Sequence, residues 1–334
     1  MTPAGSEGTG AVLVAPDSFK GTMTASEVAA AMSAGVAEAG LAAIELPLAD
    51  GGEGTASILM GVLGGGVLEA EASDPLGRPM RSEFVLLDDG RAVVEVASAS
   101  GLTLIPEVER DAMAASTRGT GELIAAAIAA GAGGILVAAG GSATTDGGRG
   151  AAEVLIDAGF DPAAHPITVL CDARTRWEDC PRVFAPQKGA DPAQVEELER
   201  RLVTIAAEMP RDPTGVELTG AAGGLSGGLW GWFGAELVSG AARVLDLLAF
   251  DQALAGATCV LSGEGRIDSS TAEGKLVSEV AGRSRKADKP CFAIVGEEQL
   301  DPDQASVLGI SAVREGRNPA EITACARQLV ETTL

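Results

Sequence analysis

Glycines combined with charged side chains mark four segments of this chain, each at the end of a predicted strand. They span residues 15–21, 49–55, 139–148 and 262–268. Glycines let backbone N–H groups approach an anion closely. In an open α/β sheet, ligands bind at the carboxyl ends of the strands. The segments therefore predict a site that handles phosphate.

The 139–148 segment carries the strongest phosphate signal. It follows a buried apolar strand, opens a helix and contains three hydroxyl side chains, so its amides can hold phosphate at the positive helix end. It is neither a Walker A loop nor a GxGxxG fingerprint. A purely structural turn is the alternative. The candidate phosphate-binding residues of this loop are Gly140, Gly141, Ser142, Thr144 and Asp146.

The other three segments bring acids and cations together. Asp17, Ser18 and Lys20 follow the first strand, Asp50 and Glu53 flank a run of glycines, and acids alternate with bases around Arg266. Each segment also has a purely structural interpretation. The first would be a strand-to-helix turn, the second a turn that caps a helix, and the third a solvated loop with salt bridges.

Charge elsewhere in the chain narrows the chemistry further. Lys188, in a Gln-Lys-Gly loop, is a further candidate phosphate cation, although a solvated lysine is the alternative. His165 is the only histidine, which disfavours a histidine metal site and a Ser-His-Asp triad. A general base is therefore expected to be Asp or Glu.

The elements that would position these residues alternate between strand and helix. A strand at 12–15, a helix at 25–39 and a strand at 44–48 predict right-handed βαβ units and an α/β fold. A hairpin is expected at 81–96, a single buried helix at 221–237 and a strand at 259–261 followed by the 262–268 loop. We expect a discontinuous Rossmann-like domain with a parallel sheet over 1–72 plus 286–334, and a second α/β domain over 73–285.

Composition excludes several classes of function. The net charge of −23 disfavours nucleic acids and anionic membranes as partners, so an anionic substrate needs a locally positive pocket. Five cysteines without a CxxC pair indicate free thiols in a reducing compartment. The amino terminus lacks a signal-peptide pattern, and the longest uncharged stretch, 123–139, is short and interrupted by glycine. We therefore expect a cytoplasmic protein.

Taken in order along the chain, these motifs resemble the bacterial glycerate kinase family (class I). The resemblance is carried by residues 15–21, 49–55, 74–78, 100–102, 119–122, 140–148, 186–190, 220–224 and 263–266. It implies two α/β domains with the active site in the cleft between them. It also implies ATP with Mg²⁺ as the phosphoryl donor and D-glycerate as the acceptor, with 2-phosphoglycerate as the usual product.

The resemblance suggests roles for the charged residues. Phosphoryl transfer depends mainly on positioning and on neutralising phosphate charge. Phosphate cations would be Lys20, Lys188 and Lys275. Magnesium would be placed by Asp50, Glu53, Glu264 or Asp268. The glycerate hydroxyl proton would go to Asp172 or Asp268. The substrate would be bound by Ser18 together with Arg78 or Arg266.

One departure from the family pattern keeps two alternatives open. After Cys171-Asp172 this chain continues with Ala173-Arg174, where the family usually has a Val and then Asn-Pro-Leu. A kinase for another small hydroxy acid and a related binding protein that has lost catalysis are the alternative functions. The oligomeric state stays open, a homodimer included.

Overall fold

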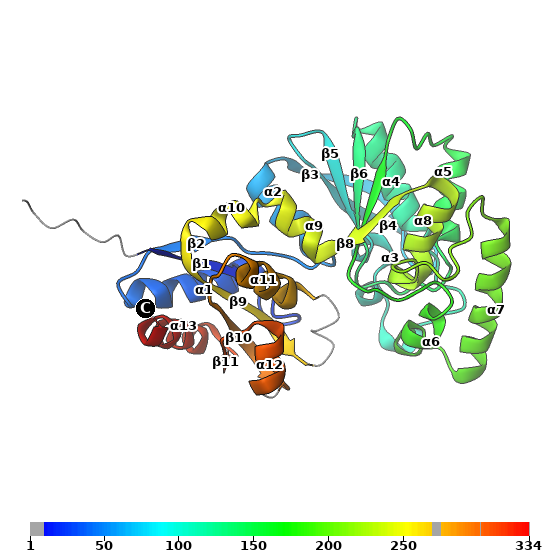
Figure 1. The fold of residues 1–334 in the computed structure, drawn as a ribbon. Helices are drawn as coiled ribbons and strands as arrows, with labels where there is room; N and C mark the ends of the chain where they lie inside the picture. The colour runs from blue at the N-terminus through cyan, green and yellow to red at the C-terminus, as the bar shows by residue number, and fades with distance from the viewer. Residues whose placement is uncertain (1–9, 269–274, 301, 334) are drawn as a thin grey trace, which may run out of the picture. The chain divides into compact units, whose positions relative to one another are not determined.

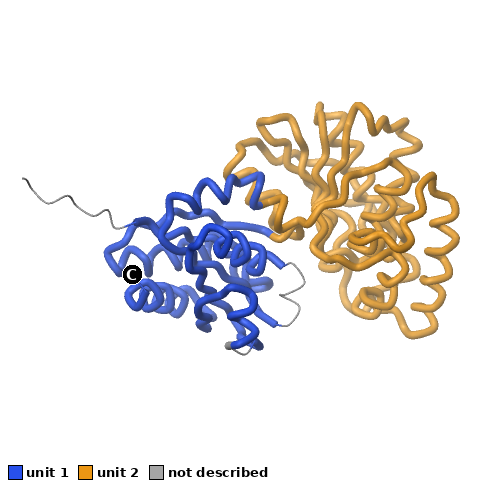
Figure 2. Tube along the Cα trace, viewed as in Figure 1, with its two compact units in different colours: residues 1–49, 245–334 blue, residues 50–244 orange. Residues whose placement is uncertain are grey.

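The chain forms two compact α/β units, each with its own sheet and hydrophobic core (Figures 1 and 2). The computed structural model describes residues 10–268, 275–300 and 302–333. Unit 1 comprises Met1–Ala49 and Leu245–Leu334, and unit 2 comprises Asp50–Val244. The predicted pair of α/β domains is confirmed. In the described part of the chain, no helix combines the length and the apolar character needed to cross a membrane.

The boundaries between the units differ from the predicted ones at 72 and 285. Strand pairing explains the difference. Strand β9 (Ala257–Ile267) is hydrogen-bonded to strands from both ends of the chain, so the segment before 286 joins unit 1. Strand β3 (Gly66–Ser73) pairs along its whole length with β4 (Pro79–Leu86) and therefore belongs to unit 2.

The sheet of unit 1 has five parallel strands in the order β11-β10-β9-β1-β2. The remaining strands are β1 (Ala11–Pro16), β2 (Ala43–Glu45), β10 (Cys291–Glu298) and β11 (Ala312–Glu315). Counted along unit 1, this is the doubly wound order 2-1-3-4-5, and the switch point lies between β1 and β9. The parallel sheet expected for the Rossmann-like domain is confirmed.

Helices α1 (Ala25–Glu38) and α13 (Pro319–Thr333) cover one face of this sheet with an apolar cluster. Thr24 caps α1: its hydroxyl accepts from the Glu27 N–H at 3.2 Å, and the Glu27 carboxylate accepts from the Thr24 N–H at 2.8 Å. Outside this cluster, β9 is contacted by α10 (Phe250–Ala255) and α11 (Leu276–Lys286), and α12 (Pro302–Leu308) precedes β11.

The prediction of a loop at 262–268 is wrong, because β9 continues to Ile267. Strand β10 is long enough to supply partners, with Glu297 opposite Arg266 and Glu298 opposite Ile267. Alternate residues of a strand share a face. Glu264 and Arg266 therefore project from the same side of β9, the first buried and the second exposed.

The sheet of unit 2 has six strands in the order β3-β4-β5-β6-β7-β8. Its other strands are β5 (Arg91–Glu95), β6 (Gly134–Ala138), β7 (Ile167–Cys171) and β8 (Glu236–Ser239). Strands β5 to β8 are parallel, and β4 pairs antiparallel with β5, which confirms the predicted hairpin. Strand β3 extends the hairpin by one edge strand that the residue pattern did not predict.

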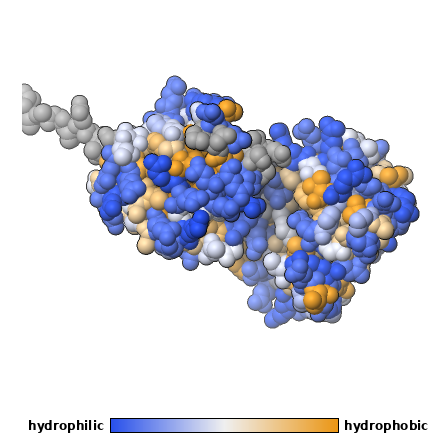
Figure 3. All heavy atoms as spheres, turned by 90° about the horizontal axis from the view of Figure 1, so that it is seen from below, coloured by the Kyte–Doolittle hydropathy of each residue, from blue (hydrophilic) through white to orange (hydrophobic). Residues whose placement is uncertain are grey.

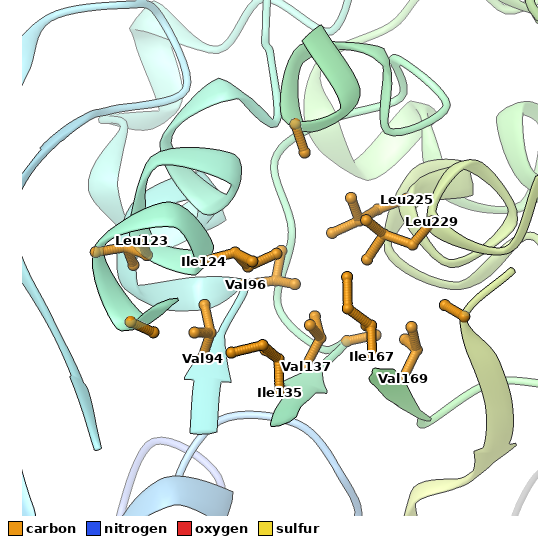
Figure 4. Packing of buried hydrophobic residues seen from close by; sticks show 14 of the residues in the cluster. Val94, Val96, Leu123, Ile124, Ile135, Val137, Ile167, Val169, Leu225 and Leu229 are labelled. Atoms are coloured by element: carbon orange, nitrogen blue, oxygen red, sulfur yellow. The ribbon is translucent and has the colours of Figure 1, made fainter. Parts of the chain in front are cut away.

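One face of this sheet packs against α4 (Arg118–Ala129), α5 (Arg149–Asp157) and α8 (Leu225–Phe233) (Figure 4). Val94, Val137 and Val169 from neighbouring strands meet Leu123 and Leu225 from the helices. The other helices and 3₁₀ turns of the unit are α2 (Thr55–Leu63), α3 (Ala97–Ser100), η1 (Leu102–Leu104), η2 (Glu107–Glu109), α6 (Cys180–Phe184), η3 (Pro186–Lys188), α7 (Pro192–Glu208), η4 (Ala221–Gly224) and α9 (Gly240–Leu247), which ends in unit 1.

The single buried helix predicted at 221–237 is wrong, because this segment contains η4, α8 and the start of β8. Ala222 and Gly223 have φ angles of 51° and 66°, which break the helix near its start. Gly234 has a φ of 71° and ends α8. Left-handed backbone of this kind is easiest for glycine, so Gly223 and Gly234 separate α8 from the residues on either side.

The face drawn in Figure 3 is mostly hydrophilic, and its hydrophobic residues occur in small groups. This distribution agrees with the net charge of −23. All five cysteines are free thiols, as predicted, and four of them are buried.

Candidate functional site

The 139–148 loop follows β6 and is held by the segment after β5. The Leu102 N–H donates to the Gly141 carbonyl at 2.8 Å, and the Ala143 N–H donates to the Ser100 carbonyl at 2.8 Å. These bonds fix the first half of the loop, so its polar groups are positioned before any ligand arrives.

Glycines bring several chain segments of unit 2 together at the carboxyl ends of β6, β7 and β8. A Cβ atom on Gly140 would lie 2.6 Å from the Gly52 Cα and 3.4 Å from an Asp172 carboxylate oxygen. A Cβ on Gly51 would lie 2.6 Å from the Gly240 Cα. Only glycine permits such contacts. The predicted 49–55 and 139–148 loops therefore meet, and Asp172 lies beside them.

Lys188, at the end of η3, contacts the 139–148 loop. Its ammonium group donates to the Ser142 hydroxyl at 2.9 Å and to the Thr144 carbonyl at 2.5 Å, and the residue is only 3% exposed. Both acceptors are uncharged. Burial lowers the pKa of the ammonium from 10.5 to about 8, although negative charge at Asp146 and other groups opposes the shift. The alternative of a solvated lysine is wrong.

Two threonines of the loop have buried polar groups without partners. Thr144 and Thr145 are 0% and 1% exposed, and neither hydroxyl has a hydrogen-bond partner in the described part of the chain. Their backbone N–H groups donate to no acceptor among the described residues either. Buried donors are rarely left unpaired in proteins. Together with Lys188, they form a compact set of donors suited to an anion.

Asp146 has a structural role in this arrangement. Its carboxylate accepts from the N–H groups of Thr117 at 2.8 Å, Gly148 at 3.1 Å and Gly150 at 3.2 Å. It therefore caps the start of α5, whose N-cap residue is a glycine without a side chain. The amides at this helix end are already bound, so an anion would have to bind earlier in the loop than the sequence suggested.

The 49–55 loop contains the acids Asp50 and Glu53 and leads into α2. The Asp50 carboxylate accepts from the Gly52 N–H at 2.9 Å, while Glu53 is exposed. Sequence reasoning missed Glu95, the last residue of β5, whose carboxylate accepts from the Ala56 N–H at 2.8 Å. The available signal was an acid at a strand end, the same pattern that marked the other segments.

In unit 1, the predicted residues Asp17, Ser18 and Lys20 lie at the switch point between β1 and β9. The Asp17 N–H donates to the Gly263 carbonyl at 2.8 Å, and the Asp17 carboxylate accepts from the Ser18 N–H at 2.7 Å. A Cβ on Gly265 would lie 3.3 Å from the Lys20 backbone nitrogen. The loop after β1 therefore lies directly against the end of β9.

The end of β9 carries a group of opposite charges. Asp268 forms ion pairs with Arg266 at 3.4 Å and with Lys275 at 3.6 Å. The Arg266 and Lys275 side chains are 58% and 38% exposed, whereas Glu264 is only 9% exposed. Lys275 is also the N-cap residue of α11. Four predicted site residues therefore gather on one side of unit 1.

Arg78 lies in the turn between β3 and β4 of unit 2. Its guanidinium donates to Asp74 at 2.5 Å and to Glu109 at 2.8 Å. Burial would raise the pKa of the Asp74 carboxyl, but hydrogen bonds from Arg78 and Leu76 outweigh it and lower the pKa. Arg78 is already engaged by two carboxylates, which weakens its case as a substrate-binding residue.

The predicted magnesium ligands are divided between the units, with Asp50 and Glu53 in unit 2 and Glu264 and Asp268 in unit 1. Among the described residues, no set of three or more His, Cys, Asp or Glu side chains is arranged to hold a metal ion. Magnesium often takes one or two carboxylates and completes its shell with phosphate oxygens and water. The donor set beside the glycine loops fits that mode of binding.

Comparisons with known proteins connect both groups of residues to one family. The sequence model of the Glycerate kinase family matches residues 12–179 and 156–333. The chain is 36% identical to the glycerate 2-kinase of Escherichia coli (strain K12), over 90% of this chain and 89% of that protein. It is also 36% identical to the glycerate kinase of Bacillus subtilis (strain 168), with the same coverage.

A solved structure agrees with these sequence relatives. The crystal structure of a candidate glycerate kinase 2 from Salmonella typhimurium LT2 matches with a TM-score of 0.82 and 33% identity. The match covers 97% of this chain and 98% of the other.

Proposed function

The chain belongs to the glycerate kinase family, and from this premise we propose that it transfers the γ-phosphoryl group of ATP to D-glycerate. One observation supports the binding of ATP as phosphoryl donor. The Lys188 ammonium is buried against a loop in which Thr144 and Thr145 have hydrogen-bond donors without partners. An ammonium buried against neutral oxygens is costly, and a bound phosphate would compensate its charge.

The phosphates of ATP would bind the first half of the 139–148 loop, through the amides and hydroxyls around Gly140, Gly141, Ser142 and Thr144. Lys188 would contribute positive charge through its contacts with Ser142 and Thr144. Lys20 and Lys275 of unit 1 would supply the remaining positive charge. Such donors stabilise the charge that moves onto the phosphate oxygens in the transition state.

Magnesium is the second cofactor of the proposal. Asp50 and Glu53 would hold the ion directly or through water, and Glu264 is the candidate from unit 1. When bound, Mg²⁺ supplies neutralisation of the donor's phosphate charge.

Acceptor chemistry requires a base and a carboxylate-binding group. The glycerate hydroxyl oxygen would attack the γ-phosphorus, the bond to the ADP oxygen would break, and the hydroxyl proton would pass to Asp268 or Asp172. Arg266 is our first choice for the glycerate carboxylate, with Ser18 nearby at the switch point, because Arg78 already has two acidic partners. The name of the E. coli relative, glycerate 2-kinase, supports 2-phosphoglycerate as the product.

A coupled assay of ADP release tests the proposal. Purified protein is incubated with ATP and Mg²⁺, with and without D-glycerate, and phosphorus NMR identifies the phosphorylated carbon. We expect ADP release that depends on D-glycerate and a 2-phosphoglycerate signal. Turnover only with another hydroxy acid from a substrate panel would redirect the proposal. Binding without turnover of any acceptor would mean a protein that has lost catalysis.

Two further expectations accompany this function. We propose that the protein acts in the cytoplasm, because its five free cysteines suit a reducing compartment. Light scattering of the purified protein measures the oligomeric state directly and tests whether it forms a homodimer. A monomeric mass at working concentrations would remove the dimer without affecting the kinase assignment.

A further inference from the structure

Glu95 joins two parts of unit 2 that are distant in sequence. It ends β5, and its carboxylate accepts from the N–H of Ala56, 39 residues earlier, at 2.8 Å. The backbone N–H of Gly54 also acts on this carboxyl and lowers its pKa. Burial raises the pKa of this carboxyl, as do the charges of Glu53 and Glu83, while the two amides lower it. The residue is thus a partly buried acid whose described hydrogen bonds go to the start of α2.

Helix α2 needs this acid because it has no cap of its own. Its N-cap residue is Gly54, with a φ of 91°, and no side chain of the helix start accepts from the first amides. Helices normally satisfy those amides with a Ser, Thr, Asp or Asn side chain at the N-cap. Glu95 supplies the missing acceptor from strand β5.

The position of the 49–55 loop depends on where α2 begins. Gly52 of this loop approaches Gly140 so closely that a Cβ on either residue would find the other within 3.6 Å. The segment that begins at Glu95 also holds the phosphate loop, through the Leu102 and Ala143 bonds described above. One short segment therefore braces both glycine loops, one through a side chain and the other through the backbone.

We propose that Glu95 is a positioning residue of the phosphoryl-transfer site, which fixes Asp50 and Glu53 by capping α2. The inference rests on the proposed function. The inference extends the proposed function, because Glu95 contacts neither substrate and acts only through the loop that it holds. The hydrogen-bond acceptor, and not the charge, is what this role requires.

Two substitutions separate the acceptor from the charge. Glu95→Gln keeps an oxygen in place, whereas Glu95→Ala removes it. We expect Glu95→Ala to lower kcat about 10²-fold, the loss typical of a displaced catalytic group. We also expect the Mg²⁺ concentration for half-maximal activity to rise about tenfold, because removing a group that orients metal ligands weakens metal binding by about this factor. Glu95→Gln should stay within about threefold of the wild type.

Glu83→Gln is the matched control, because Glu83 is an exposed acid whose charge acts on Glu95. It should leave kcat and the Mg²⁺ dependence unchanged. Wild-type kinetics in Glu95→Ala would overturn the proposal. An equal loss in Glu95→Gln and Glu95→Ala would also overturn it, because the charge itself would then be needed.

Hydrogen exchange supplies a readout that needs no substrate. The Ala56 amide lies in the first turn of α2, where helices leave their amides without an intrahelical acceptor. We expect peptides covering 54–60 to exchange faster in Glu95→Ala than in the wild type, and at the wild-type rate in Glu95→Gln. Unchanged exchange in Glu95→Ala would refute the cap even if the kinase assay fails. An inactive wild type with the expected exchange pattern would refute the proposed function alone.

Discussion

The 139–148 loop of unit 2 and the ends of β1 and β9 in unit 1 both collect polar groups at the carboxyl ends of parallel strands, but by opposite means. In unit 2 the groups are buried: Lys188 is 3% exposed and Thr144 is fully buried. In unit 1 the cations extend into solvent, and the Arg266 and Lys275 side chains are 58% and 38% exposed.

This difference suggests a division of work. Buried donors have been desolvated and fixed during folding, so they can meet phosphate charge without reorganising. Exposed long side chains lose conformational freedom when they engage a ligand, but they adapt to its shape. Variants in the unit 2 loop should therefore change both nucleotide affinity and stability. Variants at the end of β9 should change turnover or acceptor affinity and leave stability alone.

Asp268→Asn should produce the largest effect and tests the unit 1 side of this division. If Asp268 accepts the glycerate proton, kcat should fall about 10²- to 10⁴-fold, as for a lost general base. The melting temperature should not change, because the residue is partly exposed. Steady-state kinetics and thermal unfolding measure both quantities. Asp303→Asn, at an exposed acid of the same unit, is the control.

Asp172→Asn belongs in the same experiment. Asp172 lies beside Gly140 in unit 2 and is the other candidate base. A larger loss in Asp172→Asn than in Asp268→Asn would place the proton acceptor in unit 2. The division of work between the units would then be wrong.

Lys188→Met should produce the next largest effect. Methionine fills a similar volume without charge, so the loop should persist while its positive potential is lost. We expect kcat/KM for ATP to fall about 10²-fold, the order seen when one oxyanion donor is removed. The KM for D-glycerate should change little. A loss confined to D-glycerate would show that Lys188 does not serve the nucleotide.

The same variant makes a prediction about stability. The folded-state pKa of Lys188, about 8, lies below its ordinary value of 10.5. Between these values the unfolded chain binds more protons, so the wild type gains stability as the pH rises. The free energy of unfolding of Lys188→Met does not have this dependence. Measured relative to the wild type, it should therefore fall by roughly 3 kcal/mol between pH 8 and 10.5. Denaturant unfolding of both proteins measures it. Buried thiols with a raised pKa, such as Cys291, destabilise both proteins at high pH, and their effect largely cancels in the difference. If the difference in unfolding free energy between Lys188→Met and the wild type does not change with pH, Lys188 is not buried as an ammonium.

The sequence predicted local features well where short-range rules decide them. The buried strand at 12–15 and the helix after Thr24 follow from an apolar run and a capping residue, and both occur. The glycine loops were also recognisable, because clustered glycines directly after a buried strand indicate a tight turn or a close backbone approach. The contact between the loops at Gly52 and Gly140 could not be predicted from the sequence, because it depends on the tertiary approach of two chain segments.

The misses have the same physical origin. The 262–268 segment contains two glycines and alternating charges, so it resembles a loop, yet β10 supplies partners that keep it in the sheet. The role of Glu95 depends on a helix 39 residues earlier that lacks its own cap. Asp146 stays a predicted residue of the phosphate loop, but its carboxylate accepts from the amides at the helix end that looks open in the sequence. Each error concerns a partner distant in sequence or a group satisfied inside the protein.

Lys20→Ala should have an intermediate effect and sharpens the comparison of lysines. Lys20 is exposed and follows β1, whereas Lys188 is buried. If Lys20 neutralises phosphate charge in the transition state, kcat should fall about 10- to 100-fold. Because the Lys20 side chain is exposed, the free energy of unfolding should change by less than about 1 kcal/mol at pH 7. Kinetics and unfolding at pH 7 and pH 10 distinguish the two lysines. Near-wild-type turnover would remove Lys20 from the site.

The smallest effect concerns the two arginines proposed for the glycerate carboxylate. Arg266→Ala should raise the KM for D-glycerate about five- to tenfold, the value of one charge-assisted hydrogen bond. Arg78→Ala should change this KM by less than about twofold, because its guanidinium is already paired with Asp74 and Glu109. Initial rates at varied D-glycerate and saturating ATP measure both values. The reverse ranking would mean that Arg78 leaves its two carboxylates to bind the substrate, and the acceptor would then be held by unit 2.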